Sequence, residues 1–345
     1  MLKILVIGDT HYKPNTLKRS QVMIDRIEEK IKELKPELII MLGDLEDKFS
    51  MLNAPVSSLI TNFLTMLRSY APSIILIGNH SRISNDVFCT DEHSYNMVKL
   101  WTSDPHPITI VDYPVNHKYK NIQFTFCPYC PDGRFIEALN LAPGWQNSRI
   151  IFCHQDFLGA KYNSQISTTG DDVSSITNLP MIISGHIHDF QEIKIRGEVK
   201  IIYTGSPMQH AFSENPVKSL SLVHVSSTSF EHERIMLDVP IFWTFKIHFK
   251  DVASYKPPQL PTHSDMKLVI EGTFAELKNM HKTKKISEWR QAGIRIQPSI
   301  IADKTKQVQP LDMDIINRVS FMTQLKEHLI EEHREMIKKN IEKML

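Results

Sequence analysis

Residues 2–11 have the sequence LKILVIGDTH, in which a short apolar run ends in a glycine, an aspartate and a histidine. The same pattern returns at 38–47 (LIIMLGDLED), 74–80 (IILIGNH), 150–155 (IIFCHQ) and 181–188 (MIISGHIH). Short apolar runs that stop at glycine or a polar residue are typical of buried strands. In layered α/β sheets, functional groups gather at the carboxyl ends of such strands. The five stretches therefore predict an α/β fold whose strand ends bring these polar side chains together.

The polar residues of these clusters are mainly carboxylates and imidazoles, with one asparagine, and together they suit a metal centre. Each cluster alone is ambiguous, because D-x-H and G-N-H also occur as ordinary turns and helix caps. Carboxylate with imidazole favours Mn, Fe or Zn, whereas Mg and Ca prefer oxygen ligands alone. A centre of two ions about 3.5–4 Å apart can activate a water against a phosphate ester. Five clusters in this order, each after an apolar run, predict such a two-metal phosphoesterase.

The clusters resemble the motifs of the calcineurin-like metallophosphoesterases, which are D-x-H, G-D-x-x-D, G-N-H-[DE], H and G-H-x-H. The resemblance implies a four-layer α-β-β-α sandwich that binds two divalent metal ions, which we expect to be Mn²⁺. It also implies the ligands, position by position: Asp9, His11 and His188 for one ion, Asn79, His154 and His186 for the other, and Asp44 as the bridging carboxylate.

Two further roles, and one departure, come from the same resemblance. His80 matches the catalytic histidine that the family places near the scissile phosphate, and Asp47 matches a carboxylate that supports the ligands from behind. The family usually has Asp or Glu after G-N-H, where this chain has Ser81. A carboxylate there would orient and charge the imidazole of His80. The sequence therefore leaves open whether Ser81 lowers the activity.

A narrower resemblance concerns the segment after the fifth cluster. The stretch YTGSP at 203–207, with Phe212 and Glu214 after it, is similar to the Y-x-G-S-P…F-x-E segment of SbcD-type (MRE-type) double-strand-break repair nucleases. Compact phage recombination endonuclease subunits have a similar length. The resemblance implies a metallophosphoesterase domain at 1–240, a small α+β capping domain at 241–303, and a C-terminal tail at 304–345. We expect the cap to contain strands at 242–247, 266–270 and 294–301, and a helix at 273–291.

We expect the binding sites for partners to lie on the tail and on the cap. Residues 311–345 have apolar positions every three to four residues, which predicts a helix. We expect this helix to bind an SbcC-type coiled-coil ATPase subunit, although packing on its own domain is the alternative. A homodimer is a further expectation. Basic residues that we expect to bind DNA phosphates lie in the cap helix: Lys278, Lys282, Lys284, Lys285 and Arg290. The hairpin residues 118–120 are a second basic candidate, and an ordinary solvated surface is the alternative for both.

Composition sets the outer limits. The 345 residues have a net charge of only +1, so the chain has no global basic field that would indicate nucleic acid. No apolar run is long enough to cross a membrane, and the first strand leaves no room for a cleavable signal. We therefore expect a protein that is not secreted, and that acts in the cytoplasm, the nucleus or a viral replication site. Cys127 and Cys130 form a C-x-x-C pair, which fits a strand-end turn better than a zinc or redox site.

Three classes of function remain open from the sequence. The first is a DNA exonuclease and endonuclease subunit of a recombination complex, acting on duplex ends, single strands or hairpins. The second is a stand-alone phosphodiesterase or phosphatase, and the third is a scaffold with weakened catalysis. The G-S-P…F-x-E segment, the cap and the tail favour the first class, whereas Ser81 is the main support for the third.

Overall fold

The computed structural model describes residues 1–47, 53–162 and 165–301. The expected C-terminal helix and its ATPase-binding role lie outside these residues. The strands of the first large sheet, in chain order, are β1 (Leu2–Ile7), β2 (Leu38–Met41), β3 (Ser73–Leu76), β4 (Ile108–Val111), β13 (Ser219–Val225) and β14 (Phe230–Met236). Their spatial order is β14-β13-β1-β2-β3-β4, and β1 to β4 run parallel. Three of the five polar clusters therefore follow neighbouring parallel strands.

The second large sheet carries the other two clusters. Its strands are β5 (Val115–Tyr119), β6 (Ile122–Cys127), β7 (Ile150–His154), β10 (Met181–Gly185), β11 (Gln191–Ile195) and β12 (Glu198–Tyr203). Their spatial order is β11-β12-β10-β7-β6-β5. The β5–β6 hairpin expected from the sequence is present and antiparallel. A separate short hairpin follows β7 and consists of β8 (Lys161–Tyr162) and β9 (Gln165–Ile166).

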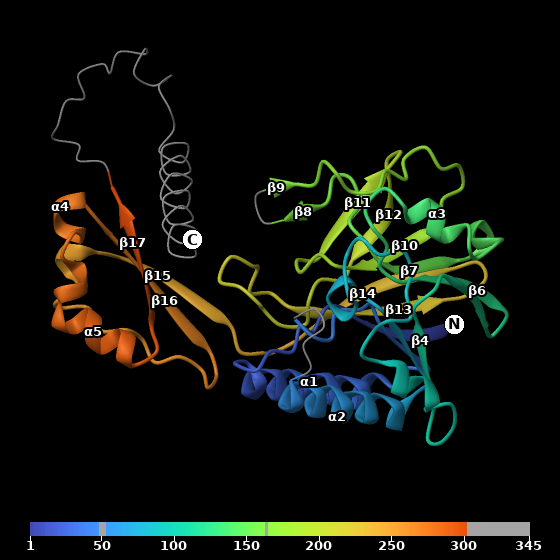
Figure 1. Cartoon of the computed structure of the whole chain (residues 1–345), viewed down its shortest axis with the longest axis horizontal. Helices are drawn as coiled ribbons and strands as arrows, with labels where there is room; N and C mark the ends of the chain where they lie inside the picture. The colour runs from blue at the N-terminus through green and yellow to red at the C-terminus, as the bar shows by residue number, and fades with distance from the viewer. Residues whose placement is uncertain (48–52, 163–164, 302–345) are drawn as a thin grey trace, which may run out of the picture.

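The two sheets pack face to face, with helices on the outside (Figure 1). Between them lies an apolar layer to which both contribute, including Val6, Ile40, Phe124 and Phe152, each fully buried. Because both faces of the central strands are covered, these strands are continuous apolar runs rather than alternating ones. The α/β sandwich predicted from the sequence is confirmed, with few helices.

Two long helices, α1 (Leu17–Leu34) and α2 (Ala54–Tyr70), cover the outer face of the first sheet. Asn53 caps α2, since its side chain accepts a hydrogen bond from the amide of Val56 at 3.3 Å. The buried side of α2 presents Phe63, Leu64 and Leu67, whose spacing gives one apolar stripe. The second sheet has a shorter cover, α3 (Phe135–Leu139). Single turns of 3₁₀ helix are η1 (Asn79–Ser81), η2 (Asn96–Leu100), η3 (Trp145–Asn147), η4 (Phe249–Asp251) and η5 (Met280–Lys282).

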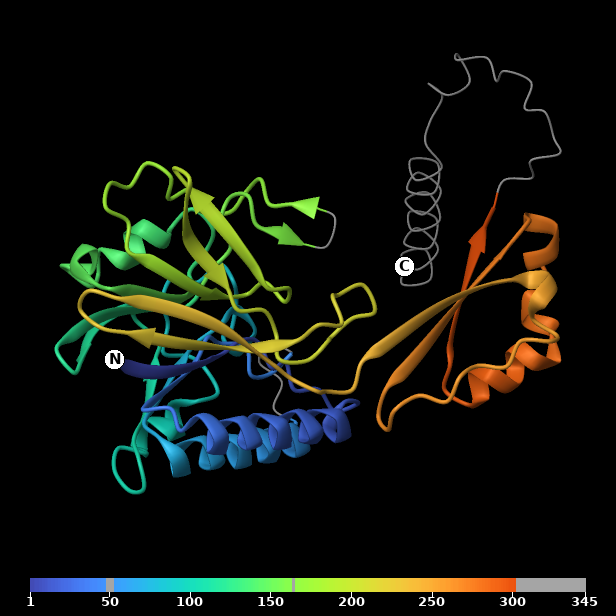
Figure 2. The same cartoon turned by 180° about the vertical axis from the view of Figure 1, so that it is seen from behind.

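The cap has a three-stranded parallel sheet of its own, with the order β15-β16-β17. Its elements are β15 (Phe242–His248), β16 (Asp265–Gly272), α4 (Phe274–Leu277), α5 (Lys284–Gln291) and β17 (Arg295–Ile300). The helices pack on one face of this sheet, where Ile286 of α5 shares an apolar core with Leu268 and Ile270 of β16. In Figures 1 and 2 they lie on the side of the cap that faces away from the rest of the molecule.

The cap strands agree with the sequence prediction, whereas the single helix expected at 273–291 is wrong. It is divided into α4 and α5 by the turn η5. Thr273 and Glu276 form a capping box that begins α4, and Thr283 has an extended backbone directly before α5. Met280 in the turn is buried in the cap core. No helix in the described ranges is long and apolar enough to span a membrane.

Candidate active site

The five polar clusters meet at one rim of the sandwich, because each follows the carboxyl end of a central strand. Asp9, Asp44 and Asn79 come after β1, β2 and β3, whereas His154 ends β7 and His186 directly follows β10. Asp9 and His154 are fully buried, and Asp44 and Asn79 are at most 5% exposed. Burying so many polar groups is costly unless they are paired or bind a cation.

Glycines make this convergence possible. Gly43 has φ +115°, and a Cβ atom there would lie 2.7 Å from Nδ1 of His154. A Cβ atom on Gly78 would lie 2.2 Å from the carboxylate of Asp44. Asp44 itself has φ 46° and His11 has φ 42°, both in the left-handed region. Such backbone strain is concentrated at functional sites, where the surrounding structure must hold it in place.

The first group of potential ligands consists of Asp9, His11 and His188, whose ligand atoms lie within 4.8 Å of one another. The Nε2 atoms of the two histidines are 3.0 Å apart. One carboxylate oxygen of Asp9, Oδ1, accepts a hydrogen bond from the amide of His186 at 2.8 Å. The other oxygen, Oδ2, is buried with no hydrogen-bond partner. A buried, unsatisfied carboxylate oxygen beside two imidazoles is what a cation site requires.

The second group consists of Asp44, His154 and His186, with Asn79 between them. The side-chain oxygen of Asn79 lies 2.9 Å from Nε2 of His154 and 3.0 Å from Nδ1 of His186. Asp44 Oδ2 lies 3.2 Å from His154 and 3.7 Å from Nε2 of His11 in the first group. Asp44 therefore stands between the two groups, where a bridging carboxylate would be.

The histidines are oriented for metal ligation by the groups behind them. His154 Nδ1 donates to the carbonyl oxygen of Leu42 at 2.7 Å, and His188 Nδ1 donates to Glu214 Oε1 at 2.9 Å. With Nδ1 protonated, each ring directs an Nε2 lone pair into the site, as metal-bound histidines usually do. The donor set, the unsatisfied oxygen of Asp9 and these tautomers fit two divalent cations.

In the second group, the charge of each side chain depends on its neighbours. Burial would raise the pKa of Asp44, but His154 outweighs burial and lowers it to about 2. Burial would lower the pKa of His154, but Asp44 and Asp9 raise it to about 9. The pKa of His186 falls to about 3, because its ring is buried and lies beside His154. Without cations, a proton on His154 therefore balances the negative charge of Asp44, and a bound cation would take the place of that proton.

His80 lies beside the first group, with its ring edge-on to that of His11 at 4.8 Å between centroids. Its backbone amide donates to Asp44 at 2.9 Å, and its Nδ1 lies 2.6 Å from the carbonyl oxygen of Asp47. The Asp47 carboxylate pairs with Lys13 at 2.8 Å. Nδ1 of His80 therefore has a backbone carbonyl oxygen as a partner.

Ser81 is directed to a different partner. Its hydroxyl donates to Glu46 Oε2 at 3.2 Å, and the hydroxyl of Tyr95 also donates to that carboxylate. Burial raises the pKa of Glu46 to about 7. A carboxylate therefore stands close to position 81, although it belongs to the second cluster rather than the third.

Beside the ligands lies a cavity of about 380 Å³ that the sequence did not predict. Its lining includes His186 and His188 and four further residues with side chains suited to a phosphate ester: Lys13, Lys161, Tyr162 and His210. His210 Nε2 lies 3.1 Å from the carbonyl oxygen of Asp9, and its ring lies 5.0 Å from that of His11. The position of His210 within the segment after G-S-P was the one signal available for it.

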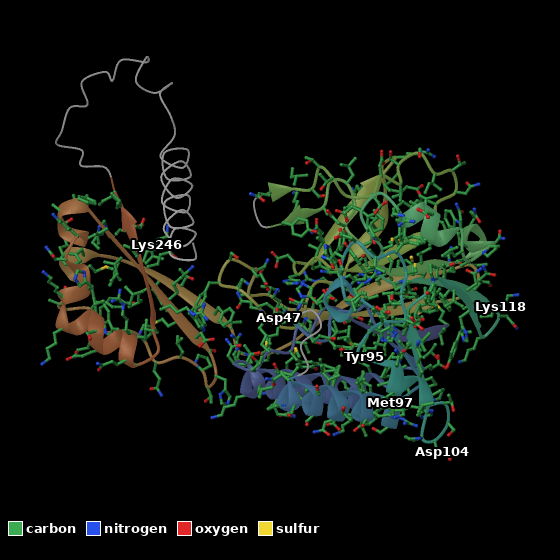
Figure 3. All side chains as sticks on the ribbon, viewed as in Figure 1. Asp47, Tyr95, Met97, Asp104, Lys118 and Lys246 are labelled. Atoms are coloured by element: carbon green, nitrogen blue, oxygen red, sulfur yellow. The ribbon has the colours of Figure 1, made fainter. Side chains whose placement is uncertain are left out.

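The basic residues expected to bind DNA are not near the metal ligands. Lys278, Lys282, Lys284, Lys285 and Arg290 belong to the helical side of the cap, which faces away from the core (Figure 1). Lys118, on the β5–β6 hairpin, lies at the end of the molecule opposite to the cap (Figure 3).

All four cysteines are free and buried, and among the described residues no potential ligand group includes a cysteine.

Comparison with known proteins agrees with this geometry. Residues 2–190 match the family model of the calcineurin-like phosphoesterases. The chain is 32% identical over 292 residues to "Putative phosphoesterase 244L" of Invertebrate iridescent virus 6, which covers 82% of this chain and 98% of that protein. It is 30% identical over 309 residues to "Putative phosphoesterase 078R" of Invertebrate iridescent virus 3, covering 86% of this chain and 85% of that protein. The chain belongs to the calcineurin-like phosphoesterases.

Proposed function

We propose that this calcineurin-like phosphoesterase is a Mn²⁺-dependent DNA nuclease that cuts duplex ends, hairpins and single strands, working with an SbcC-type ATPase. The observation that carries the proposal is a basic sheet face on the cap, on the side that its helices leave uncovered. A phosphoesterase for small substrates would need only the cavity beside the metal ligands. A second basic surface suits a long polyanion that extends beyond that cavity.

The alternation of the cap strands defines this face. Met266, Leu268 and Ile270 point to the helices, so residues 265, 267, 269 and 271 of β16 point to the opposite side. Through the strand register, Thr244 and Arg295 flank Lys267 on that side, and Lys246 lies next to Val269. We call the positions 244, 246, 248, 267, 269, 271, 295, 297 and 299 the open cap face.

Charge on the open cap face is mainly positive. It contains Lys246, Lys267, Arg295 and His248. Of the two acidic residues on this side of β16, Glu271 lies 3.9 Å from Lys246, and Asp265, at the start of the strand, pairs with Arg19 of α1 at 3.0 Å. The Lys246 side chain is 70% exposed, and Figure 3 labels it on the cap. Lysine and arginine contacts to phosphates provide affinity that does not depend on sequence, as a nuclease acting on DNA ends needs.

The residues of the core supply the chemistry. Two bound divalent cations would provide an activated water and stabilise the charge on the phosphate oxygens. Asp44 and the other residues of the two ligand groups would hold these ions. The carbonyl oxygen of Asp47 satisfies Nδ1 of His80, so Nε2 is the nitrogen through which this ring can deliver a proton to the leaving oxygen.

The first test is a nuclease assay with Mn²⁺ on blunt duplex, hairpin and single-stranded DNA, with and without a candidate ATPase. We expect cutting of all three DNAs, and ATP-dependent cutting of duplex ends when the ATPase is present. Hydrolysis of bis(p-nitrophenyl) phosphate without any cutting of DNA would contradict the proposal. That result would instead favour a stand-alone phosphodiesterase.

A matched pair of cap variants tests the surface. Lys246→Glu reverses a charge on the open cap face, whereas Lys284→Glu reverses one on α5, where the side chain is 92% exposed. We expect only Lys246→Glu to weaken DNA binding and to reduce its salt dependence, by about 0.9 in slope for each phosphate that the variant no longer neutralises. The opposite result would assign DNA to the basic cap helix. If both variants bind DNA like the wild type, the cap does not take part in DNA recognition.

The partner proposal rests on the sequence of residues 311–345. Deleting them should leave hydrolysis of bis(p-nitrophenyl) phosphate intact and abolish co-purification with an SbcC-type ATPase. A truncated protein that still binds the ATPase would place the partner surface elsewhere.

A further inference from the structure

The loop between β12 and β13, residues 204–218, contacts both the metal ligands and the cap. We call it the bridging loop. It contains the G-S-P…F-x-E segment, to which the sequence pattern alone assigns no physical role. Different side chains of the loop make these two contacts, and they lie only a few residues apart in the sequence.

At the site, the bridging loop supports the first ligand group. Glu214 Oε1 accepts the hydrogen bond from His188 Nδ1 at 2.9 Å. Glu214 Oε2 accepts from the backbone amide of His210 at 3.0 Å and from Lys218 Nζ at 2.9 Å. Lys218 also donates to the carbonyl oxygen of His188 at 2.9 Å. Three hydrogen bonds therefore fix the carboxylate of Glu214 behind His188.

At the cap, the same loop inserts Phe212 among residues of the cap sheet. Its ring stacks on that of Phe242 with 4.6 Å between centroids and 19° between planes. Arg295 and Lys267, both on the open cap face, lie 5.0 Å and 5.1 Å from the centroid of Phe212. Cations at this distance from an aromatic ring are attracted to its face. Phe242 is also contacted by Arg19 of α1, which lies 3.8 Å from the ring centroid.

Gln209 joins the two ends. Its side-chain oxygen accepts a hydrogen bond from the amide of Phe242 at 2.8 Å, and its nitrogen donates to the carbonyl oxygen of Glu214 at 2.9 Å. Gln209 is 2% exposed, so both hydrogen bonds are shielded from water. A single buried side chain therefore connects the first strand of the cap with the residue that holds His188.

We propose that Phe212 and Gln209 are positioning residues through which the cap sets the placement of His188, and hence the affinity of the first ligand group for its cation. The proposal rests on the metal-dependent hydrolysis of the proposed function, but not on DNA being the substrate. In the second ligand group, His154 is held by Leu42 and Asn79, which belong to the sandwich. The effect is therefore selective for one of the two ions.

The placement also connects the cap surface with the site. Lys267 and Arg295 face the ring of Phe212 and lie on the open cap face. A phosphate bound there would therefore compete with the ring for these two basic side chains. Occupation of the cap by a polyanion would then be transmitted to His188 through the bridging loop. Residues that support a metal ligand from behind typically change metal affinity by about 10–100-fold when they are replaced.

The test is calorimetric titration of the full-length protein with Mn²⁺. We expect Phe212→Ala and Glu214→Gln to weaken the binding of one ion about tenfold or more and to leave the other ion unchanged. Phe212→Tyr keeps the ring and should bind both ions like the wild type. Trp243→Ala is the matched control, because Trp243 is also an aromatic residue of a stacked pair in the cap, with Phe245 at 6.1 Å. It should leave both affinities unchanged.

A double variant tests the route. If Phe212 acts through Glu214, then Phe212→Ala combined with Glu214→Gln should bind Mn²⁺ no more weakly than Glu214→Gln alone. Additive losses would overturn the proposal, as would wild-type affinities in Phe212→Ala or an equal loss at both ions. These titrations contain no DNA, so their outcome is separate from that of the nuclease assays.

Discussion

The two ligand groups of the site are supported in different ways. Asn79, His154 and His186 sit on strand ends of the sandwich, and Nδ1 of His154 is held by the carbonyl oxygen of Leu42. Asp9 and His188 also follow strands, but the bridging loop holds the carbonyl oxygen of Asp9 through His210 and the ring of His188 through Glu214. The first arrangement changes only if the core changes. The second can respond to the cap, so one half of the site is built for rigidity and the other for adjustment.

The shared carboxylate should show the largest effect, because both halves depend on it. Replacing Asp44 with alanine removes the group that lies between His11 and His154. Metal catalysis supplies several kcal/mol of transition-state stabilisation. We therefore expect hydrolysis of bis(p-nitrophenyl) phosphate to fall by on the order of 10³-fold or more. Activity near the wild-type level would mean that Asp44 does not bridge the two halves.

His80 should affect the chemistry of both halves without affecting either ion. His80→Ala is expected to lower kcat by about 10²–10⁴-fold, the usual contribution of a general acid. Because His80 is not among the assigned ligands, calorimetry should still show two Mn²⁺ bound with unchanged affinity. A variant that loses an ion would make His80 a ligand instead.

Replacing a residue that supports the second ligand group should lower the stability of the fold. Gln155 is fully buried, and its side chain donates to Asp171 at 2.8 Å and to the carbonyl oxygen of Cys130 at 3.0 Å. Gln155→Ala leaves these groups unsatisfied, which should lower the free energy of unfolding by about 1–3 kcal/mol. Urea unfolding of Phe212→Ala, a half-buried residue, should show a smaller loss. If Phe212→Ala is the more destabilised variant, the two halves do not differ as described.

Removal of the metal should show a smaller effect, on the free energy of unfolding. Cations that bind the folded state stabilise it by about 2.7 kcal/mol at a concentration 100 times the Kd. At a fixed Mn²⁺ concentration in this range, a tenfold weaker ion in Phe212→Ala should reduce that stabilisation by about 1.4 kcal/mol. Unfolding measured with Mn²⁺ and with EDTA gives this difference directly. Equal Mn²⁺ stabilisation of the variant and the wild type would argue against selective weakening of one ion.

The sequence predicted the convergence of the polar clusters better than the groups that support them, for a physical reason. Asp9, Asp44, Asn79 and His154 follow apolar runs, and parallel strands bring their ends together. The support of His188 by Glu214 depends on the path of a long loop, which local sequence patterns do not determine. The same holds for His210, Lys13 and Tyr162 in the cavity.

The cap shows the same division. Its three strands lie where the sequence predicted them, the first from its alternation, whereas the single helix at 273–291 was wrong, because buried Met280 and extended Thr283 divide it. The covered face of the sheet could not be inferred before the helices were placed. The sequence therefore could not show that Lys246 and Arg295 share one face, whereas the basic residues of the cap helix are close together in the sequence.

We propose that two divalent cations share Asp44 between the two unequal ligand groups. Electron paramagnetic resonance of the Mn²⁺-loaded protein tests it most directly, because two ions about 3.5–4 Å apart across a shared carboxylate are magnetically coupled. We predict a coupled two-Mn²⁺ spectrum for the wild type, and loss of that coupling in Asp44→Ala. A spectrum of isolated Mn²⁺ in the fully loaded wild-type protein, or unchanged coupling in Asp44→Ala, would show that the ions do not share Asp44.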